Sequence, residues 1–477
     1  MAARGRRRHP AVAALLTVTL LLLTGCSSGA ADPKPPRPPA DGGDQRYGVA
    51  PASDPEVTYQ PDVVFVGGGG GSVRGLSEDA LTWRIDPGAS GADKLARGKV
   101  MFLTGRAVGR VLDVRSDGDD LAVTLGPVDI TQVIRDGTFA SDGPVSLESP
   151  TRYDGGTPFW AEYDAEAGGA GGGGGARGAA STTPVLRRVP QSSGEQRRVA
   201  GFAVTPICCA RGVGAHFTYD GGGIRISGTA TLLMKKPTAR FHLEIRGATV
   251  QRAELEISGV AGLRIEIAGA TDRGHNINKR IPIPLDFSVP VDQILGVPFA
   301  VTASQLIGVQ TAFSAKDGNI KAAGEWSLGG SLGFGYANGA FGATEPWSLT
   351  LRNSITDSIT GPSVGVNGII VHYQAAFRAG LGALGFTAGL YATVTTSVGL
   401  TVGSALGSPI TVCRSTQLGL YLDYGVGYSI PAGLVKVINA FLDLVNVAPI
   451  GAKAGIGGSD VLFSKLDLQP NTRICRS

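Results

Sequence analysis

Residues 386–402 read FTAGLYATVTTSVGLTV, a stretch in which apolar residues alternate with small or polar ones. The apolar parity comprises Phe386, Ala388, Leu390, Ala392, Val394, Val398, Leu400 and Val402. Threonine, serine, glycine and Tyr391 occupy the other parity. Successive side chains of a β-strand point to opposite faces of the sheet, so this pattern predicts a long strand with one buried face.

The same alternation recurs along most of the chain beyond residue 200. It is found in the segments 224–232, 241–245, 253–257, 263–267, 281–291, 326–336, 347–351 and 418–430. Repeated alternating segments are typical of antiparallel sheet, so residues 200–477 are predicted to form a large antiparallel, β-sandwich-like domain in a mainly β protein. Pro282, Pro284 and Pro290 cannot donate ladder hydrogen bonds, which predicts that residues 281–291 form an edge strand.

One segment near the C-terminus has a helical period instead. Its apolar residues recur on one helix face: Leu434, Val437, Ile438, Phe441 and Val445. Pro431 precedes the segment and Pro449 limits its end. A single C-terminal helix is therefore predicted within the large domain.

A smaller β domain is predicted over residues 61–165. Its strand candidates are 63–66, 99–104, 106–115 and 120–125. Ser116-Asp117-Gly118-Asp119 separates the last two strands and contains the Asp-Gly pair that favours a tight hairpin turn.

Two low-complexity segments flank this small domain. Residues 26–60 are rich in proline and glycine and contain the run PKPPRPP at 33–39, which favours an extended, semi-rigid tether. Residues 166–199 are rich in glycine and serine, lack the apolar residues of a core, and predict a flexible linker.

The N-terminus combines an arginine-rich start, an apolar run over 11–23 and the sequence Leu23-Thr24-Gly25-Cys26. The apolar run is shorter than the roughly 20 residues that a spanning helix needs. The segment resembles the signal peptide and lipobox of bacterial prolipoproteins. This resemblance implies that residues 1–25 are removed by cleavage between Gly25 and Cys26. It also implies that a lipidated Cys26 anchors the protein to the cell membrane, outside the cytoplasm. The alternative is an ordinary secretory signal in which Cys26 is incidental.

The formal net charge of +4 arises from 43 Lys and Arg against 39 Asp and Glu. The first 25 residues contain four arginines and no acidic residue, so 39 basic residues face 39 acidic ones after cleavage. No stripe of basic residues interleaved with aromatic ones is present. The sequence therefore does not predict nucleic-acid binding.

Four further cysteines lie in the large domain: Cys208, Cys209, Cys413 and Cys475. An oxidising exterior favours disulfides, and four cysteines allow three connectivities. A bond between the adjacent Cys208 and Cys209 requires a strained ring, so each is expected to pair with Cys413 or Cys475. A metal site is not predicted, because the five histidines are scattered along the chain.

Three local motifs match chemistry-bearing patterns only in part. The glycines at 67–71 follow a strand candidate, but no proper helix follows them, so a glycine turn is predicted rather than a dinucleotide site. Residues 329–333 read GGSLG and match the G-x-S-x-G nucleophile motif, but they are expected within a strand. Asp117, Asp119 and Asp120 lack the spacing of a full calcium loop and are expected to form a solvated turn.

Three hypotheses about function follow. The first is a non-enzymatic surface lipoprotein whose β-rich body serves for binding or for structural display. This hypothesis includes no catalytic residues and no cofactor, and its partner is an unknown surface ligand or protein. The second is a lipid-binding or membrane-active β protein, suggested by the long alternating strands of 369–430. The third is an exported enzyme whose site assembles distant residues such as Asp220, His216, Glu244 and His275.

Overall fold

The structure is a computed structural model of the 477-residue chain. It describes residues 50–77, 81–104, 107–144, 197–199, 201–207, 212–272, 277–313, 318–343, 348–353, 355, 357–360, 366–381, 388–405, 408–430, 432–444, 448–451 and 453–475. The predicted signal peptide at 1–25, Cys26 and most of both predicted linkers lie outside the described residues. The fold is mainly β, as the alternation predicts, with three sheets and one α-helix in the described part of the chain.

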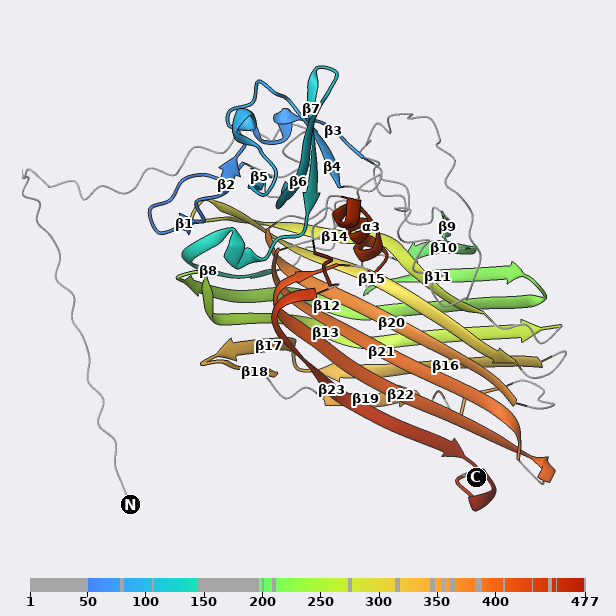
Figure 1. The fold of residues 1–477 in the computed structure, drawn as a ribbon. Helices are drawn as coiled ribbons and strands as arrows, with labels where there is room; N and C mark the ends of the chain where they lie inside the picture. The colour runs from blue at the N-terminus through green and yellow to red at the C-terminus, as the bar shows by residue number, and fades with distance from the viewer. Residues whose placement is uncertain are drawn as a thin grey trace, which may run out of the picture. The chain divides into compact units, whose positions relative to one another are not determined.

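The small sheet has six short strands in the order β2-β5-β6-β7-β4-β3 (Figure 1). These strands are β2 (Val63–Phe65), β3 (Val73–Leu76), β4 (Thr82–Ile85), β5 (Val100–Thr104), β6 (Ala107–Asp117) and β7 (Asp120–Gly126). Strands β2 and β5 pair in parallel and the other neighbours are antiparallel. The predicted hairpin is confirmed, since Asp117 pairs with Asp120 across a turn in which Gly118 has φ 64°.

The first large sheet has 11 strands. They are β1 (Thr58–Tyr59), β8 (Ile134–Pro144), β9 (Arg197–Val199), β10 (Phe202–Ile207), β11 (Gly212–Gly221), β12 (Ile224–Arg246), β13 (Thr249–Thr271), β16 (Gly318–Gly329), β17 (Leu332–Ala337), β18 (Ala340–Ala343) and β19 (Ser348–Asn353). Strand β8 belongs to the predicted small domain by sequence, yet it pairs with β12 over residues 137–144. The predicted linker at 166–199 therefore does not coincide with a boundary between sheets.

The second large sheet has six strands in the order β14-β15-β20-β21-β22-β23. They are β14 (Asn278–Ile294), β15 (Val297–Phe313), β20 (Val366–Leu381), β21 (Ala388–Ala405), β22 (Ser408–Ser429) and β23 (Lys453–Gln469). All neighbours are antiparallel. The proline-containing strand β14 lies at one edge, which confirms the prediction.

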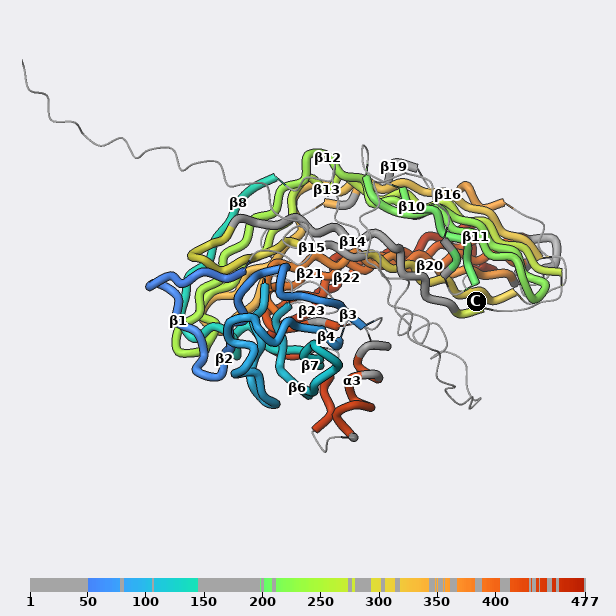
Figure 2. Tube along the Cα trace, turned by 90° about the horizontal axis from the view of Figure 1, so that it is seen from above, coloured from blue at the N-terminus to red at the C-terminus, as the bar shows by residue number. Residues whose placement is uncertain are grey.

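The two large sheets pack face to face and bury the apolar parity of each strand between them (Figures 1 and 2). The ring of Phe299 on β15 contacts Phe139 on β8 and Phe241 on β12, with ring centroids 4.9 and 5.4 Å apart. Farther along the sheets, Phe334 on β17 stacks on Tyr424 of β22 at 5.2 Å. Aromatic contacts of this kind join the sheets into one core.

The first large sheet bends along a line that crosses three of its strands. The ladder between β12 and β13 is interrupted between Met234 and Thr238, and the pairing with β13 passes from β16 to β17 at the same level. Lys236, Gly259 and Gly330 adopt positive φ there, at 46°, 75° and 93°. Such bulges bend a strand at the cost of local pairing.

The helix α3 (Ala432–Leu444) confirms the predicted helical segment. Ile438 and Leu442 are buried in one apolar cluster with Trp83 and other residues of the small sheet. Four short 3-10 turns complete the described elements: η1 (Gly69–Ser72), η2 (Ala92–Lys94), η3 (Ile130–Gln132) and η4 (Arg473–Cys475).

A polar pair lies inside the apolar core of the sandwich. The Tyr373 hydroxyl donates a hydrogen bond to Gln305 Oε1 over 2.6 Å, and both residues are buried. Burial raises the pKa of the Tyr373 hydroxyl far above its usual value of 10.0. The amide nitrogen Nε2 of Gln305 has no hydrogen-bond partner among the described residues. The Tyr373 hydroxyl therefore supplies the hydrogen bond that satisfies the buried side-chain oxygen of Gln305.

We expect Tyr373→Phe to lower the free energy of unfolding by about 1–3 kcal/mol at neutral pH, because it leaves Gln305 Oε1 unsatisfied as well. Above about pH 10 the tyrosine ionises in the unfolded chain but stays neutral in the folded one. The wild type therefore loses stability there through Tyr373 and the variant does not, so their difference narrows as pH rises. Urea unfolding at pH 7 and pH 11 measures the difference in free energy of unfolding between the two proteins, with Tyr421→Phe at an exposed tyrosine as the control. A free-energy difference that stays constant between these pH values contradicts the prediction.

Candidate functional site

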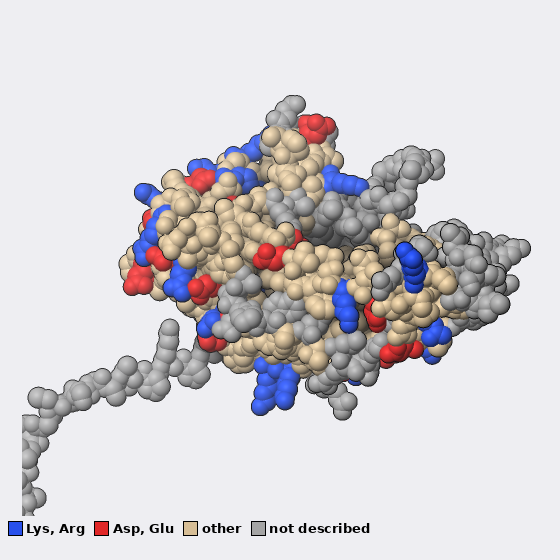
Figure 3. Space-filling view, turned by 90° about the horizontal axis from the view of Figure 1, so that it is seen from below, with Lys and Arg blue, Asp and Glu red and all other residues tan. Residues whose placement is uncertain are grey.

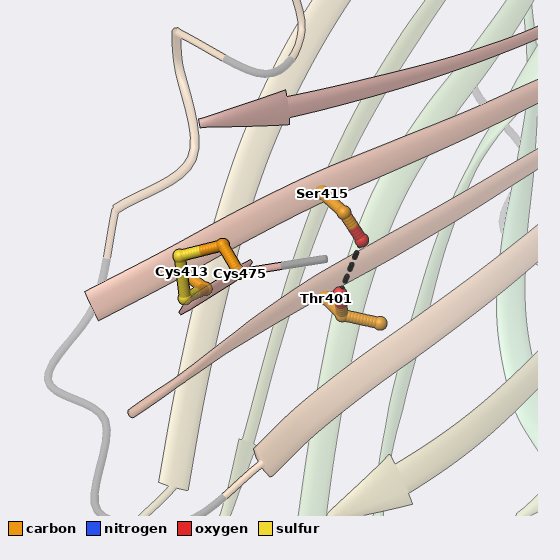
Figure 4. The surroundings of a disulfide bond; sticks show 4 residues. All are labelled: Thr401, Cys413, Ser415 and Cys475. Carbon is orange, nitrogen blue, oxygen red and sulfur yellow. Dashed lines mark hydrogen bonds between the residues drawn. A yellow bond between two sulfur atoms is a disulfide. The ribbon is translucent and has the colours of Figure 1, made fainter. Parts of the chain in front are cut away.

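The structure confirms one disulfide and corrects the expected pairing. Cys413 on β22 is bonded to Cys475 in η4, with Cα atoms 5.5 Å apart (Figure 4). The expectation that Cys413 and Cys475 each pair with Cys208 or Cys209 was wrong. The register explains the bond: β23 runs antiparallel to β22 and returns the C-terminal turn to the start of that strand. Cys208 and Cys209 lie outside the described residues, as do Gly25 and Cys26.

The polar residues of the enzyme hypothesis are not brought together. Asp220 forms an exposed ion pair with Arg225 at 2.9 Å, and His216 Nδ1 lies 3.2 Å from Thr229 Oγ1. Glu244 lies at the far end of β12 from Arg225, where its carboxylate is 3.3 Å from Arg246 Nε. His275 is outside the described residues. Each described member is therefore engaged with a surface neighbour of its own.

The partial motifs also have structural roles. Of the glycines at 67–71, the last three form η1 with Ser72, and β3 follows directly with no α-helix between them. Ser331 lies between β16 and β17 at the sheet bend, so its expected position inside a strand was wrong. Its hydroxyl donates to Glu256 Oε1 at 2.6 Å, and strand β17 rather than a helix follows it.

The aspartates of the hairpin turn are engaged at the surface. Asp117 Oδ2 lies 3.0 Å from Arg84 Nε on β4. Across the residues that the structure describes, no group of three or more His, Cys, Asp or Glu side chains is placed to hold a metal ion. Of the three hairpin aspartates, Asp117 thus forms an ion pair with the neighbouring strand β4.

The outer face of the first large sheet is densely charged. Arg264 Nη2 lies 2.7 Å from Glu325 Oε2 on the neighbouring strand, and Arg240 pairs with Glu256 across β12 and β13. Cross-strand pairs of opposite charge stabilise antiparallel sheets. This face is an alternating acidic and basic ladder exposed to solvent, which accounts for much of the charge of the large domain.

The outer face of the second large sheet is different, because four consecutive cross-strand rows contain no Asp, Glu, Lys or Arg on the five strands from β15 to β23. On the sixth strand, β14, Arg280 pairs with Gly308 at the edge of one of these rows. We call these rows the uncharged face. Reading from β15 to β23, they are Leu306-Gln374-Thr395-Tyr421-Val461, Gly308-His372-Ser397-Gly419-Ser464, Gln310-Ile370-Gly399-Gln417-Leu466 and Ala312-Gly368-Thr401-Ser415-Leu468. Asp423 in the next row and Arg378 in the row beyond it mark where charge resumes.

Two pairs of hydroxyl and amide side chains of the uncharged face are hydrogen-bonded within the face. Gln374 Nε2 donates to Thr395 Oγ1 at 3.3 Å, and the hydroxyls of Thr401 and Ser415 are 2.5 Å apart (Figure 4). Glycines keep the relief low: a Cβ added at Gly419 would lie 2.7 Å from the ring of Tyr421, which packs against that glycine. The result is a flat surface that mixes neutral polar groups with carbon.

Large apolar side chains are exposed on this uncharged face. Ile370 and Tyr421 are each 38% exposed, and Val461 and Leu466 on β23 are 66% and 67% exposed. In the view of Figure 3, charged side chains lie toward both ends of the molecule, and uncharged atoms cover much of the surface between them. An exposed apolar patch framed by polar groups is typical of an interaction surface.

Part of this signal is visible in the sequence. Residues 379–413 contain no Asp, Glu, Lys or Arg, and this range includes the whole of strand β21. What alternation alone does not show is which strands lie side by side, so the uncharged rows became apparent only with the register. Strand β23, with its exposed Val461 and Leu466, was not predicted as a strand at all.

Fold and surface together define a class: a two-sheet β-sandwich with a small β domain, a densely charged outer face on one sheet and the uncharged face on part of the other. Residues 183–458 match the family described as "Domain of unknown function (DUF8402)", and the chain belongs to this family. Residues 43–136 match a second family described as "Domain of unknown function (DUF8403)". No curated protein and no solved structure matches the chain. No helix in the described part of the chain has the length and apolar character needed to cross a membrane.

Proposed function

We propose that this protein is a non-enzymatic, lipid-anchored binding protein of the cell exterior, which docks a protein partner on the uncharged face. The observation that carries the proposal is the absence of charged residues from four adjacent rows across five strands of the second large sheet. The core of a protein–protein interface is depleted of charged residues and enriched in aromatic ones. Tyr421 and the exposed aliphatic residues beside it fit that composition.

The anchoring part of the proposal rests on the N-terminal sequence. The lipobox at Leu23–Cys26 supports lipidation of Cys26, and the proline-rich segment at 33–39 supports a spacer between the membrane and the body. A lipid anchor and a tether leave the sandwich free to present one face to a neighbouring protein. The separate polar residues of the first sheet, each paired with a surface neighbour, support a binding role over a catalytic one.

The test introduces a photoreactive amino acid in place of Ser397, at the centre of the uncharged face, in the full-length chain in its own cells. A matched position is Thr229, which occupies the corresponding outer side of the first large sheet. We expect a discrete protein adduct from position 397 and none from position 229. The captured protein, once purified, should bind the wild-type chain.

A charge placed in the face then tests the interface directly. We expect Thr395→Glu to weaken binding of the captured protein tenfold or more, because the interface would bury an unpaired carboxylate. Thr229→Glu on the charged sheet should leave binding unchanged. Equal adducts from both positions, or binding that tolerates Thr395→Glu, would contradict the proposal. Adducts confined to phospholipid would instead support the lipid-binding alternative.

A further inference from the structure

The two edges of the second large sheet differ in their capacity to accept another strand. Edge strand β14 contains Pro282, Pro284 and Pro290, which lack the N–H that a neighbouring strand requires. Edge strand β23 spans 17 residues without a proline. A long edge strand that contains no proline presents backbone N–H and C=O groups with which another strand can pair.

Strand β23 is also fixed in place as a template. It pairs with β22 along its whole length, and the bond between Cys413 and Cys475 fastens the turn that follows it. Two large apolar side chains of β23, Val461 and Leu466, are about two-thirds exposed. On the other side of the strand, no ion pair joins Lys465 or Asp467 to any described residue. The edge thus presents charged groups without an ion-pair partner among the described residues, together with exposed apolar side chains.

The sequence around Leu466 is complementary to itself in the antiparallel direction. When two copies of β23 pair with Leu466 opposite Leu466, Lys465 of each copy lies opposite Asp467 of the other. The flanking pairs are Ser464 with Leu468 and Phe463 with Gln469, and Pro470 limits the ladder. Directly opposite residues in an antiparallel pair share one face of the sheet, so both ion pairs form on the same side.

We propose that a second copy of this chain docks on β23 by antiparallel strand pairing about a two-fold axis at Leu466. The interface is isologous, with two identical Lys465–Asp467 pairs, which closes it as a dimer. The pairing joins two six-stranded sheets into one and places two uncharged faces side by side. This inference does not depend on the proposed function of the uncharged face.

The first test traps the dimer at its axis. In the full-length protein, Leu466→Cys places two thiols on directly opposite residues, whose Cα atoms are about 4.5–5.5 Å apart, within the range of a disulfide. Ser464→Cys is the matched control, since the two copies of residue 464 are more than about 13 Å apart along the paired strands. We expect mild oxidation to cross-link Leu466→Cys at least tenfold faster than Ser464→Cys. Equal cross-linking, or none at either position, would overturn the proposal.

The second test uses the charges and needs no new bond. Lys465→Glu and Asp467→Lys each replace two attractive pairs with two repulsive ones, so either should raise the dimer dissociation constant tenfold or more in analytical ultracentrifugation. The double variant restores opposite charges across the axis and should restore dimerisation. Unchanged thermal unfolding of each variant shows that the fold is intact. A double variant no better than the singles, or a wild type that stays monomeric at all concentrations, would refute the pairing.

Discussion

Phe299→Ala should lower the free energy of unfolding by about 3–5 kcal/mol, the typical cost of removing a buried phenylalanine side chain. Phe299 on β15 is 2% exposed and contacts Phe139 on β8 and Phe241 on β12. Truncation therefore opens a cavity where the two large sheets meet, lined by rings that cannot all collapse into it. Urea unfolding followed by far-ultraviolet circular dichroism measures the loss.

Two matched variants separate cavity formation from other effects. Phe299→Leu keeps most of the side-chain volume and should cost clearly less than alanine. Thr401→Ala on the uncharged face removes a solvent-facing methyl and hydroxyl, and should cost no more than about 1 kcal/mol. If Phe299→Ala lost as little as Thr401→Ala, the two sheets could not be joined through this aromatic contact.

The sandwich was predictable because its strands are long and each buries one parity. The apolar parity of 386–402 is buried from Ala388 onward in the described strand β21, and the same holds for Phe241, Leu243 and Ile245 on β12. The proline-containing edge strand and the C-terminal helix were also predicted from the sequence. In each case a local property of the chain, alternation or a missing N–H, dictates the structure without reference to distant residues.

Strand β23 escaped prediction because a bulge breaks its alternation. Leu420 pairs with Phe463 and Tyr421 with Val461, so Leu462 is an additional residue and the parity shifts there. As a result Asp460, Phe463 and Lys465 all lie on the same side of the sheet, which no simple period reveals. Asp460 and Lys465 are exposed at the sheet edge, which permits charges on that side although Phe463 packs against the core.

The disulfide pairing and the uncharged face could not be predicted from the sequence for a different, shared reason. Both depend on which strands are neighbours, and neighbours in a sheet are set by topology. Cys413 meets Cys475 because β22 and β23 are antiparallel, although 62 residues separate them in the sequence. The uncharged rows likewise form only when β15, β20, β21, β22 and β23 are aligned in register.

Removing the disulfide with Cys413→Ser and Cys475→Ser together should lower the free energy of unfolding by about 2–4 kcal/mol. The bond closes a loop with a sequence separation of 62, and a cross-link over a long loop restricts the unfolded chain. The loss should also have a local component, because the bond fastens the end of edge strand β23 to β22. We therefore expect the double variant to exchange its amide hydrogens faster than the wild type over residues 463–469, and this increase should exceed any increase in the central strand β21.

The neighbouring hydroxyl pair provides the control for this loss. Thr401 and Ser415 lie on the same two-strand region as Cys413 (Figure 4), so Ser415→Ala changes the same site without touching the covalent link. It should cost no more than about 1 kcal/mol. If the double serine variant unfolded at the same urea concentration as the wild type, the bond would not restrain the unfolded chain. If exchange in β23 were also unchanged, the pairing with β22 alone would suffice to hold the edge strand, and the disulfide would contribute nothing to the template that strand presents.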